Sequence, residues 1–149
     1  AEITLGAWSR LLRRHDGNVL VDSPRAATAL LDRIDALGGV RRMLLTHSDD
    51  VGDHERLHAR FRCERWIHQA DPDASTASVE RTFSGHAPFA WAPDLTVVPV
   101  PGHTEGSSAL LWRARDLQIL KTNGVVAFVE NRFEGGCLCA AGFWRARGR

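Results

Sequence analysis

Two short stretches of the sequence carry side chains that can bind a metal ion. The first is His47-Ser48-Asp49-Asp50-Val51-Gly52-Asp53-His54, and the second is Gly102-His103-Thr104-Glu105-Gly106-Ser107. Each follows an apolar run typical of a buried strand, so their imidazoles and carboxylates are expected to emerge together at the ends of two neighbouring strands. Such nitrogen and oxygen ligands suit Zn²⁺, Mn²⁺ or Fe²⁺ better than metals that seek thiolates. The sequence therefore predicts a site for one or two of these cations.

A β-α-β-α-β alternation is expected to position the first stretch. An Asp16-Gly17 turn between two apolar runs predicts a hairpin. After it, Ser23 is expected to cap a helix that has Pro24 at its first position and that ends at Gly38-Gly39. The predicted elements are strands Trp8–Leu12 and Asn18–Asp22, this helix, strand Arg42–Thr46, a short helix Asp53–Phe61 and strand Arg65–His68.

The second half of the chain reads as a series of strands. Residues 69–93 are rich in Asp, Ser, Ala, Thr and Pro, which indicates a loop-rich connection with a turn of helix or an edge strand near Val79–Phe83. Beyond it, the predicted strands are Leu95–Val100, Ser108–Trp112, Leu117–Thr122 and Val125–Val129, with a turn at Ala114-Arg115-Asp116. No segment resembles a linker, so residues 1–149 are expected to form a single domain.

Composition bounds the class of protein. The chain has 149 residues, 44% of them apolar, and a formal net charge of +1, so no overall field favours nucleic acid or a membrane as partner. No apolar run is long enough to cross a bilayer, and the N-terminus lacks the layout of a secretion signal. Three cysteines, Cys63, Cys137 and Cys139, cannot all pair within one chain. These features predict a cytoplasmic protein in a reducing compartment.

The chain resembles the metallo-β-lactamase-fold hydrolases, in the branch that has His-x-Asp-Asp-x-x-Asp-His where the commoner motif is His-x-His-x-Asp-His. The resemblance runs from about Trp8 to Phe128. It implies an αββα sandwich with a metal site at one edge of its two sheets. There, a metal-bound hydroxide would attack an ester, lactone, lactam, thioester or phosphoester. The matching segments are Gly17-Asn18-Val19-Leu20-Val21-Asp22-Ser23-Pro24, Leu37-Gly38-Gly39-Val40, Leu45-Thr46-His47, Trp66-Ile67-His68 and Pro99-Val100-Pro101-Gly102-His103-Thr104.

By matching positions, the resemblance implies His47, Asp53, His54 and His103 as metal ligands, with Asp49 in place of a histidine. Zinc is the expected ion, with manganese or iron as alternatives. Whichever of Asp49 and Asp53 is not a ligand would orient the attacking water and carry its proton. The acidic residues of the first stretch have a second explanation, because Asp49, Asp50 and Asp53 can also meet the N-terminal dipole of the following helix.

Two features depart from the family. Thr122-Asn123-Gly124 stands where the family has a Thr-Gly-Asp phrase, and the family's last histidine has no counterpart before Arg149. The sequence thus leaves two interpretations open. One is a C-terminally shortened metal-dependent hydrolase acting on a small molecule. The other is a non-catalytic scaffold or interaction module that has kept the fold with a degenerate metal site. A sheet left uncovered by the shortening predicts a homo-oligomer.

A second motif overlaps the first. His54-Glu55-Arg56-Leu57-His58 fits the His-Glu-x-x-His pattern of helical zinc proteases. Five residues carry little information, so we favour a short amphipathic helix in which Leu57 and Phe61 enter the core and Glu55 and His58 face solvent. His68, at the end of a predicted strand, is interpreted as a hydrogen-bonded packing residue rather than a ligand.

Overall fold

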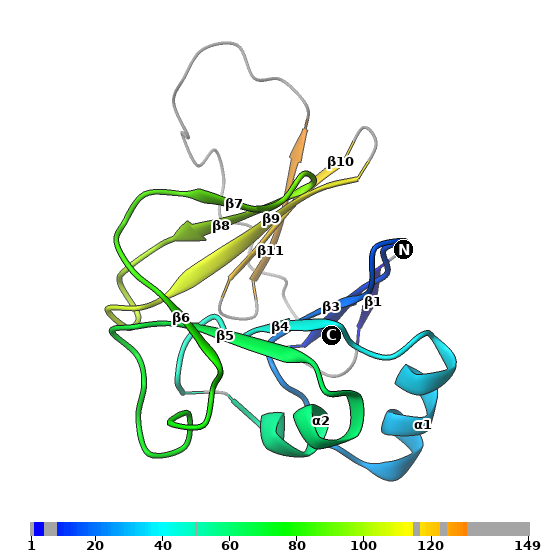
Figure 1. Ribbon diagram of the computed structural model, residues 1–149. Helices are drawn as coiled ribbons and strands as arrows, with labels where there is room; N and C mark the ends of the chain where they lie inside the picture. The colour runs from blue at the N-terminus through cyan, green and yellow to red at the C-terminus, as the bar shows by residue number, and fades with distance from the viewer. Residues whose placement is uncertain (1, 5–8, 50, 115–116, 123–124, 131–149) are drawn as a thin grey trace, which may run out of the picture.

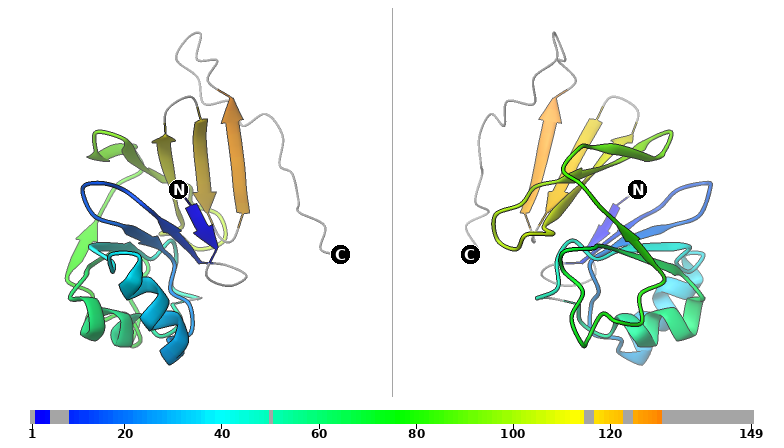
Figure 2. Two further views of the ribbon diagram at one scale, coloured as in Figure 1. Left: turned by 90° about the vertical axis from the view of Figure 1, so that its right-hand side faces the viewer. Right: turned by 60° about the vertical axis from the view of Figure 1, so that its left-hand side comes forward.

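The computed structural model describes residues 2–4, 9–49, 51–114, 117–122 and 125–130, with side chains described for residues 9–49 and 51–113. These residues form two β-sheets and two helices (Figure 1). The first sheet has strand order β1-β2-β3-β4-β5-β6, and the second has the order β11-β10-β9-β8-β7. Both helices cover one face of the first sheet, while the second sheet lies over its other face (Figures 1 and 2).

The predicted β-α-β-α-β alternation is confirmed. It comprises β3 (Val19–Val21), α1 (Thr28–Ala36), β4 (Arg42–Leu44), α2 (His54–Phe61) and β5 (Glu64–His68). Strands β3, β4 and β5 pair in parallel, as helical crossovers require. The carboxyl ends of β4 and β5 therefore lie at the same edge of the sheet, and the residues that follow His47 leave from that edge.

Strand periodicity explains how one sheet supports two cores. Met43 and Leu45 pack with the helices, whereas Leu44 between them packs toward the second sheet. In β3, Leu20 likewise packs with the helices, whereas Val19 and Val21 pack toward the second sheet. The reason is that successive side chains of a strand point to opposite faces. Strand β3 is consequently apolar throughout and β4 is apolar apart from Arg42, which is typical of a sheet that is covered on both faces.

The predicted start of α1 is wrong, whereas its end is confirmed. The helix begins at Thr28 rather than next to Ser23, and its N-cap residue Ala27 supplies no side-chain hydrogen bond. The Ser23 hydroxyl bonds the Pro24 carbonyl instead, at 3.3 Å. At the other end, the chain turns at Gly38 and Gly39, which have φ angles of +99° and +69° that glycine adopts without strain.

The edges of the first sheet are β1 (Glu2–Thr4), paired antiparallel with β2 (Arg10–Leu12), and β6 (Arg81–Phe83), paired in parallel with β5. β2 and β3 form the predicted hairpin, with Gly17 at φ +103° in its turn. β6 confirms the edge strand that was expected near Val79–Phe83. β1 was not predicted.

The second sheet is an antiparallel meander. Its strands are β7 (Phe89–Ala92), β8 (Leu95–Pro99), β9 (Ser108–Ala114), β10 (Leu117–Thr122) and β11 (Val125–Glu130). The last four confirm the predicted strands to within two residues. β7 lies in the stretch that was predicted to be a loop-rich connection, and its pairing with β8 is irregular between Ala90 and Ala92.

Several predictions fall on residues that lie outside the described part of the chain, namely Asp50, the turn residues Arg115 and Asp116, the Asn123-Gly124 departure, and Cys137 and Cys139. Within the described part, no helix combines the length and the apolar character needed to span a membrane.

Candidate metal centre

Three of the predicted ligands converge at the edge between the two sheets. His47, Asp49 and His103 each offer one ligand atom, and these atoms all lie within 4.8 Å of one another. Nε2 of His103 is 2.9 Å from Oδ2 of Asp49, and the two imidazole rings meet edge to face with centroids 5.2 Å apart. His47 is buried, whereas the other two side chains are more than half exposed. The cluster thus combines one buried ligand, His47, with two ligands that are accessible to solvent.

Thr46 determines which nitrogen of His47 is available. The backbone N–H and the hydroxyl of Thr46 both donate to Oδ1 of Asp22, each at 2.8 Å. A hydroxyl has a single proton, so Oγ1 of Thr46 accepts the Nδ1–H of His47, 3.0 Å away. In the neutral imidazole with this tautomer, Nε2 of His47 carries the lone pair that a metal ligand needs. Sequence reasoning did not single out Asp22 or Thr46, although both belong to segments quoted for the resemblance.

His103 lies in the loop between β8 and β9. The Val100 N–H donates to the Ser107 carbonyl at 2.8 Å and closes the base of the loop, while the Gly102 N–H donates to the Thr104 carbonyl at 3.0 Å. At the start of β9, the Ser108 N–H donates to the Thr46 carbonyl at 2.9 Å. This last bond ties the second sheet to the end of β4, beside His47.

Asp53 is not one of the three residues of this cluster. It occupies the N-cap position of α2 without a side-chain cap bond. Its Oδ2 accepts the Ala26 N–H at 2.8 Å, and the guanidinium groups of Arg25 and Arg56 lie 3.6 and 3.9 Å from its carboxylate. The carboxylate thus joins the start of α2 to the segment before α1. Its predicted ligand and catalytic roles stay predictions.

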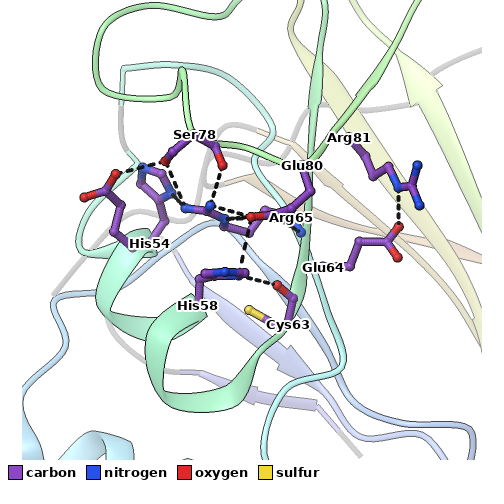
Figure 3. A network of polar contacts seen from close by, with 9 residues as sticks. His54, His58, Cys63, Glu64, Arg65, Ser78, Glu80 and Arg81 are labelled. Atoms are coloured by element: carbon purple, nitrogen blue, oxygen red, sulfur yellow. Dashed lines mark hydrogen bonds and ion pairs between the residues drawn. The ribbon is translucent and has the colours of Figure 1, made fainter.

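His54 also lies apart from the cluster, in a buried polar network (Figure 3). Its Nδ1 is 2.9 Å from Nη1 of Arg65, and its Nε2 is 2.9 Å from the Ser75 carbonyl. Because a guanidinium only donates, Nδ1 accepts and Nε2–H donates. Both ring nitrogens are therefore engaged in this arrangement. The ligand role predicted for His54 would require the ring to leave these partners, and it stays a prediction.

Arg65 and Glu80 form the centre of that network. Glu80 accepts hydrogen bonds from the backbone N–H of Arg65 at 2.9 Å and from its guanidinium, which also donates to the Ser78 carbonyl (Figure 3). Burial alone would raise the pKa of Glu80, but the hydrogen bonds from Arg65 outweigh it and lower that pKa to about 2. The carboxylate is therefore ionised at neutral pH and paired with a buried cation.

The zinc-protease interpretation of His54 to His58 finds no support in the geometry. Oε1 of Glu55 accepts the Ser78 hydroxyl at 2.9 Å, and Nδ1 of His58 bonds the Cys63 carbonyl at 2.8 Å. Leu57 is fully buried in the core, as predicted. The three polar side chains thus bond to separate neighbours instead of converging on one point.

His68 behaves as a packing residue. The Ala70 N–H donates to its Nδ1 at 3.1 Å, so its Nε2–H donates to the Gly85 carbonyl, also at 3.1 Å. Its ring packs edge to face against Phe83. Both nitrogens are satisfied within the fold, in agreement with the interpretation from sequence.

Comparison of the sequence with protein-family models and with curated proteins gives no match. Solved structures do match. A metallo-β-lactamase, MIM-1 from Novosphingobium pentaromativorans, superimposes with a TM-score of 0.55 and 25% identity over 71% of this chain and 49% of its own. The class B3 di-zinc metallo-β-lactamase LRA-12 from an Alaskan soil metagenome superimposes with a TM-score of 0.55 and 19% identity, over 75% of this chain and 53% of its own. A quorum-quenching N-acyl homoserine lactone lactonase superimposes with a TM-score of 0.58 and 12% identity, over 76% of this chain and 59% of its own.

The chain spans about half the length of the structures that it matches. The predicted α/β fold class, the metallo-β-lactamase-like αββα sandwich, is confirmed by these matches and by the two sheets of the structure. The candidate cluster lies where the resemblance places a metal site, at one edge of the two sheets. The chain therefore has the metallo-β-lactamase fold.

Proposed function

We propose that the protein is a metal-dependent hydrolase that uses a metal-activated water on the ester, lactone, lactam or phosphoester bond of a small molecule. The observation that carries this proposal is the convergence of His47, Asp49 and His103 at the edge of the two sheets. The matched structures support the reaction class, since they include metallo-β-lactamases and a lactonase.

The residues of the cluster fit a zinc ion. Two imidazoles and one carboxylate are ligand types that zinc takes, and catalytic zinc sites pair three protein ligands with one open position. The hydrogen bond from His47 to Thr46 leaves Nε2 free to coordinate. When bound, the ion would polarise the substrate oxygen and lower the pKa of water to about 7. Zinc is our proposed metal, with manganese and iron as the alternatives.

Asp49 is the better candidate for handling the proton. Its carboxylate is more than half exposed and lies against His103, whereas that of Asp53 is engaged by Ala26 and flanked by two arginines. A general base must lie within hydrogen-bond reach of the water that it activates. Because a carboxylate has two oxygens, we propose that Asp49 would hold the ion with one of them and orient the water with the other.

The test is hydrolysis of a panel of substrates by purified protein. The panel contains an N-acyl homoserine lactone, a β-lactam, a p-nitrophenyl ester and a phosphodiester, each assayed with chelator, without it, and after zinc is restored. We expect turnover of at least one substrate that chelator abolishes and zinc restores. His47→Ala and His103→Ala should lose it, while His15→Ala, a change to an exposed side chain in the β2–β3 turn, should retain it.

The opposite result would favour the scaffold interpretation. Protein that binds no zinc, manganese or iron, and that hydrolyses none of the four substrates, has kept the fold without the reaction. Activity that survives both chelator and the two histidine substitutions would place the catalytic centre elsewhere.

A further inference from the structure

We propose that Asp71 is a positioning residue for the metal centre, because its buried carboxylate holds the loop that carries His103. This inference rests on the proposed function. Asp71 lies in the connection between β5 and β6, and it is only 6% exposed. Its Oδ1 accepts the Gly106 N–H at 2.7 Å, and its Oδ2 accepts the Thr104 hydroxyl at 2.6 Å. Both carboxylate oxygens therefore bond to residues that closely follow His103 in the chain.

Asp71 is itself anchored to the first sheet. Its backbone N–H donates to the His68 carbonyl at 3.0 Å, at the end of β5. The next residue after His68, Gln69, donates its N–H to the Phe83 carbonyl of β6 at 2.8 Å. The carboxylate of Asp71 thus connects the ends of β5 and β6 in the first sheet to the loop between β8 and β9 in the second.

The residue types in the His103 loop fit this role. A Cβ atom at position 106 would lie 2.6 Å from the carboxylate of Asp71, so glycine is needed for the acid to reach the backbone N–H. Thr104 supplies the second donor, and its own hydroxyl oxygen lies 2.9 Å from that of Ser107. The Thr104 N–H donates to the same Ser107 hydroxyl oxygen at 2.9 Å. The contacts of Asp71 thereby extend through Thr104 to the base of the loop.

His103 itself has a more than half exposed side chain, so its position depends on the backbone that carries it. The loop is fixed to the first sheet at two points, by Ser108 to the end of β4 and by Asp71 to the end of β5. His47 follows the end of β4. Asp71 therefore sets where the imidazole of His103 meets Asp49 and His47, and small displacements of a ligand weaken a metal site.

The experiment compares zinc affinity between variants by competition with a chromophoric chelator. Asp71→Asn keeps the shape of the side chain, but its amide group cannot accept both bonds. We expect zinc affinity to fall by about 10- to 100-fold, the usual effect of removing a group that orients a ligand. Thr104→Val, which removes one donor, should weaken zinc in the same direction, and Thr104→Ser should restore affinity close to that of the unaltered protein.

Two further readouts separate positioning from a general loss of stability. The absorption spectrum of the cobalt-substituted protein should change in Asp71→Asn, because ligand geometry changes, and hydrogen exchange of the Gly106 amide should speed up in the metal-free protein. Asp94→Asn is the matched control, since Asp94, between β7 and β8, accepts bonds from Arg14 of the β2–β3 turn and from Trp112 of β9. It should lower thermal stability and leave zinc affinity unchanged.

The outcomes distinguish this inference from the proposed function. If the unaltered protein binds none of zinc, manganese and iron, both are overturned. If it binds zinc, and folded Asp71→Asn and Thr104→Val bind it equally well with unchanged cobalt spectra, only the inference is overturned. Should Asp71→Asn fail to fold, the comparison of Thr104→Val with Thr104→Ser decides the question.

Discussion

The hydroxyl of Thr46 links a buried carboxylate to a candidate metal ligand. It donates to Asp22 and accepts from Nδ1–H of His47, so a neutral His47 presents the lone pair of Nε2. We predict that Thr46→Val weakens zinc binding by about 10- to 100-fold, because the ring loses the partner that fixes its tautomer and its orientation. Isothermal titration of the metal-free protein with zinc measures this directly.

Thr46→Ser is the control for that prediction, because it keeps the hydroxyl and removes only a methyl group. It should bind zinc about as well as the unaltered protein. Equal zinc affinity in all three proteins would mean that His47 needs no second partner to bind metal, or that it is not a ligand.

At the scale of elements, the start of α2 is fitted closely against the segment before α1. Gly52 has a φ of +49°, and a Cβ atom there would clash with the backbone carbonyl of Ser23. We predict that Gly52→Ala destabilises the fold by about 1 kcal/mol for the left-handed backbone and by about 1 to 3 kcal/mol more for the clash. Unfolding in urea, followed by circular dichroism, measures the loss.

Gly85→Ala separates the two contributions to that loss. Gly85 has a φ of +85°, yet an added Cβ would meet nothing within 4 Å. This variant should show only the backbone cost. Equal losses at positions 52 and 85 would contradict a close fit between α2 and the segment before α1.

The bonds between Arg65 of β5 and Glu80 should make the free energy of unfolding depend on pH. Burial raises the pKa of Glu80, but hydrogen bonds from Arg65 lower it to about 2, below the usual value of 4.5. A lowered pKa contributes stability above pH 4.5 that is lost as the pH falls toward 2. Because Glu80 is partly exposed, we expect Glu80→Gln to cost about 1 to 2 kcal/mol at pH 7 after solvent screening.

Urea unfolding across the pH range tests the Glu80 prediction. The stability difference between the unaltered protein and Glu80→Gln should be present at pH 7 and should shrink as the pH falls from 4.5 to 2. A difference that stayed constant down to pH 2 would contradict the assignment.

Local sequence patterns predicted most elements but missed those set by distant contacts. Apolar runs predicted most strands of both sheets, and the glycines at 38 and 39 predicted the end of α1. The start of α1 differs because Asp53, from the loop before α2, accepts the Ala26 N–H, and Ser23 makes no cap. β7 escaped prediction because Phe89–Ala92 lies in a stretch rich in Pro, Ser and Ala, and only pairing with β8 makes it a strand.

At the scale of the whole molecule, the site also combines residues that the sequence motifs predicted with contacts that they did not. His47, Asp49 and His103 were predicted from their order and from their places after strands, and the fold brings them together. Position in a motif could not reveal that Arg65, eleven residues further on, engages His54, or that Asp71 reaches the His103 loop from the other sheet. Cytoplasmic location, a homo-oligomeric state and the His-x-Asp-Asp-x-x-Asp-His branch stay predictions.

A metal that binds between the two sheets should stabilise the whole domain. His47 follows a strand of the first sheet, and His103 follows a strand of the second, so an ion held by both joins the two layers. An ion that binds only the folded state, at a concentration 100 times its dissociation constant, adds about 2.7 kcal/mol. For a domain of this size, that corresponds to a rise in melting temperature of about 5 to 10 °C.

Differential scanning calorimetry with chelator and with zinc measures this rise. The His47→Ala, His103→Ala double variant should melt at the same temperature under both conditions, because it lacks one ligand from each sheet. A rise of equal size in the double variant would show that zinc binds elsewhere on the folded chain. An unchanged melting temperature in the unaltered protein would mean that the two layers hold no zinc between them, which would favour the scaffold interpretation.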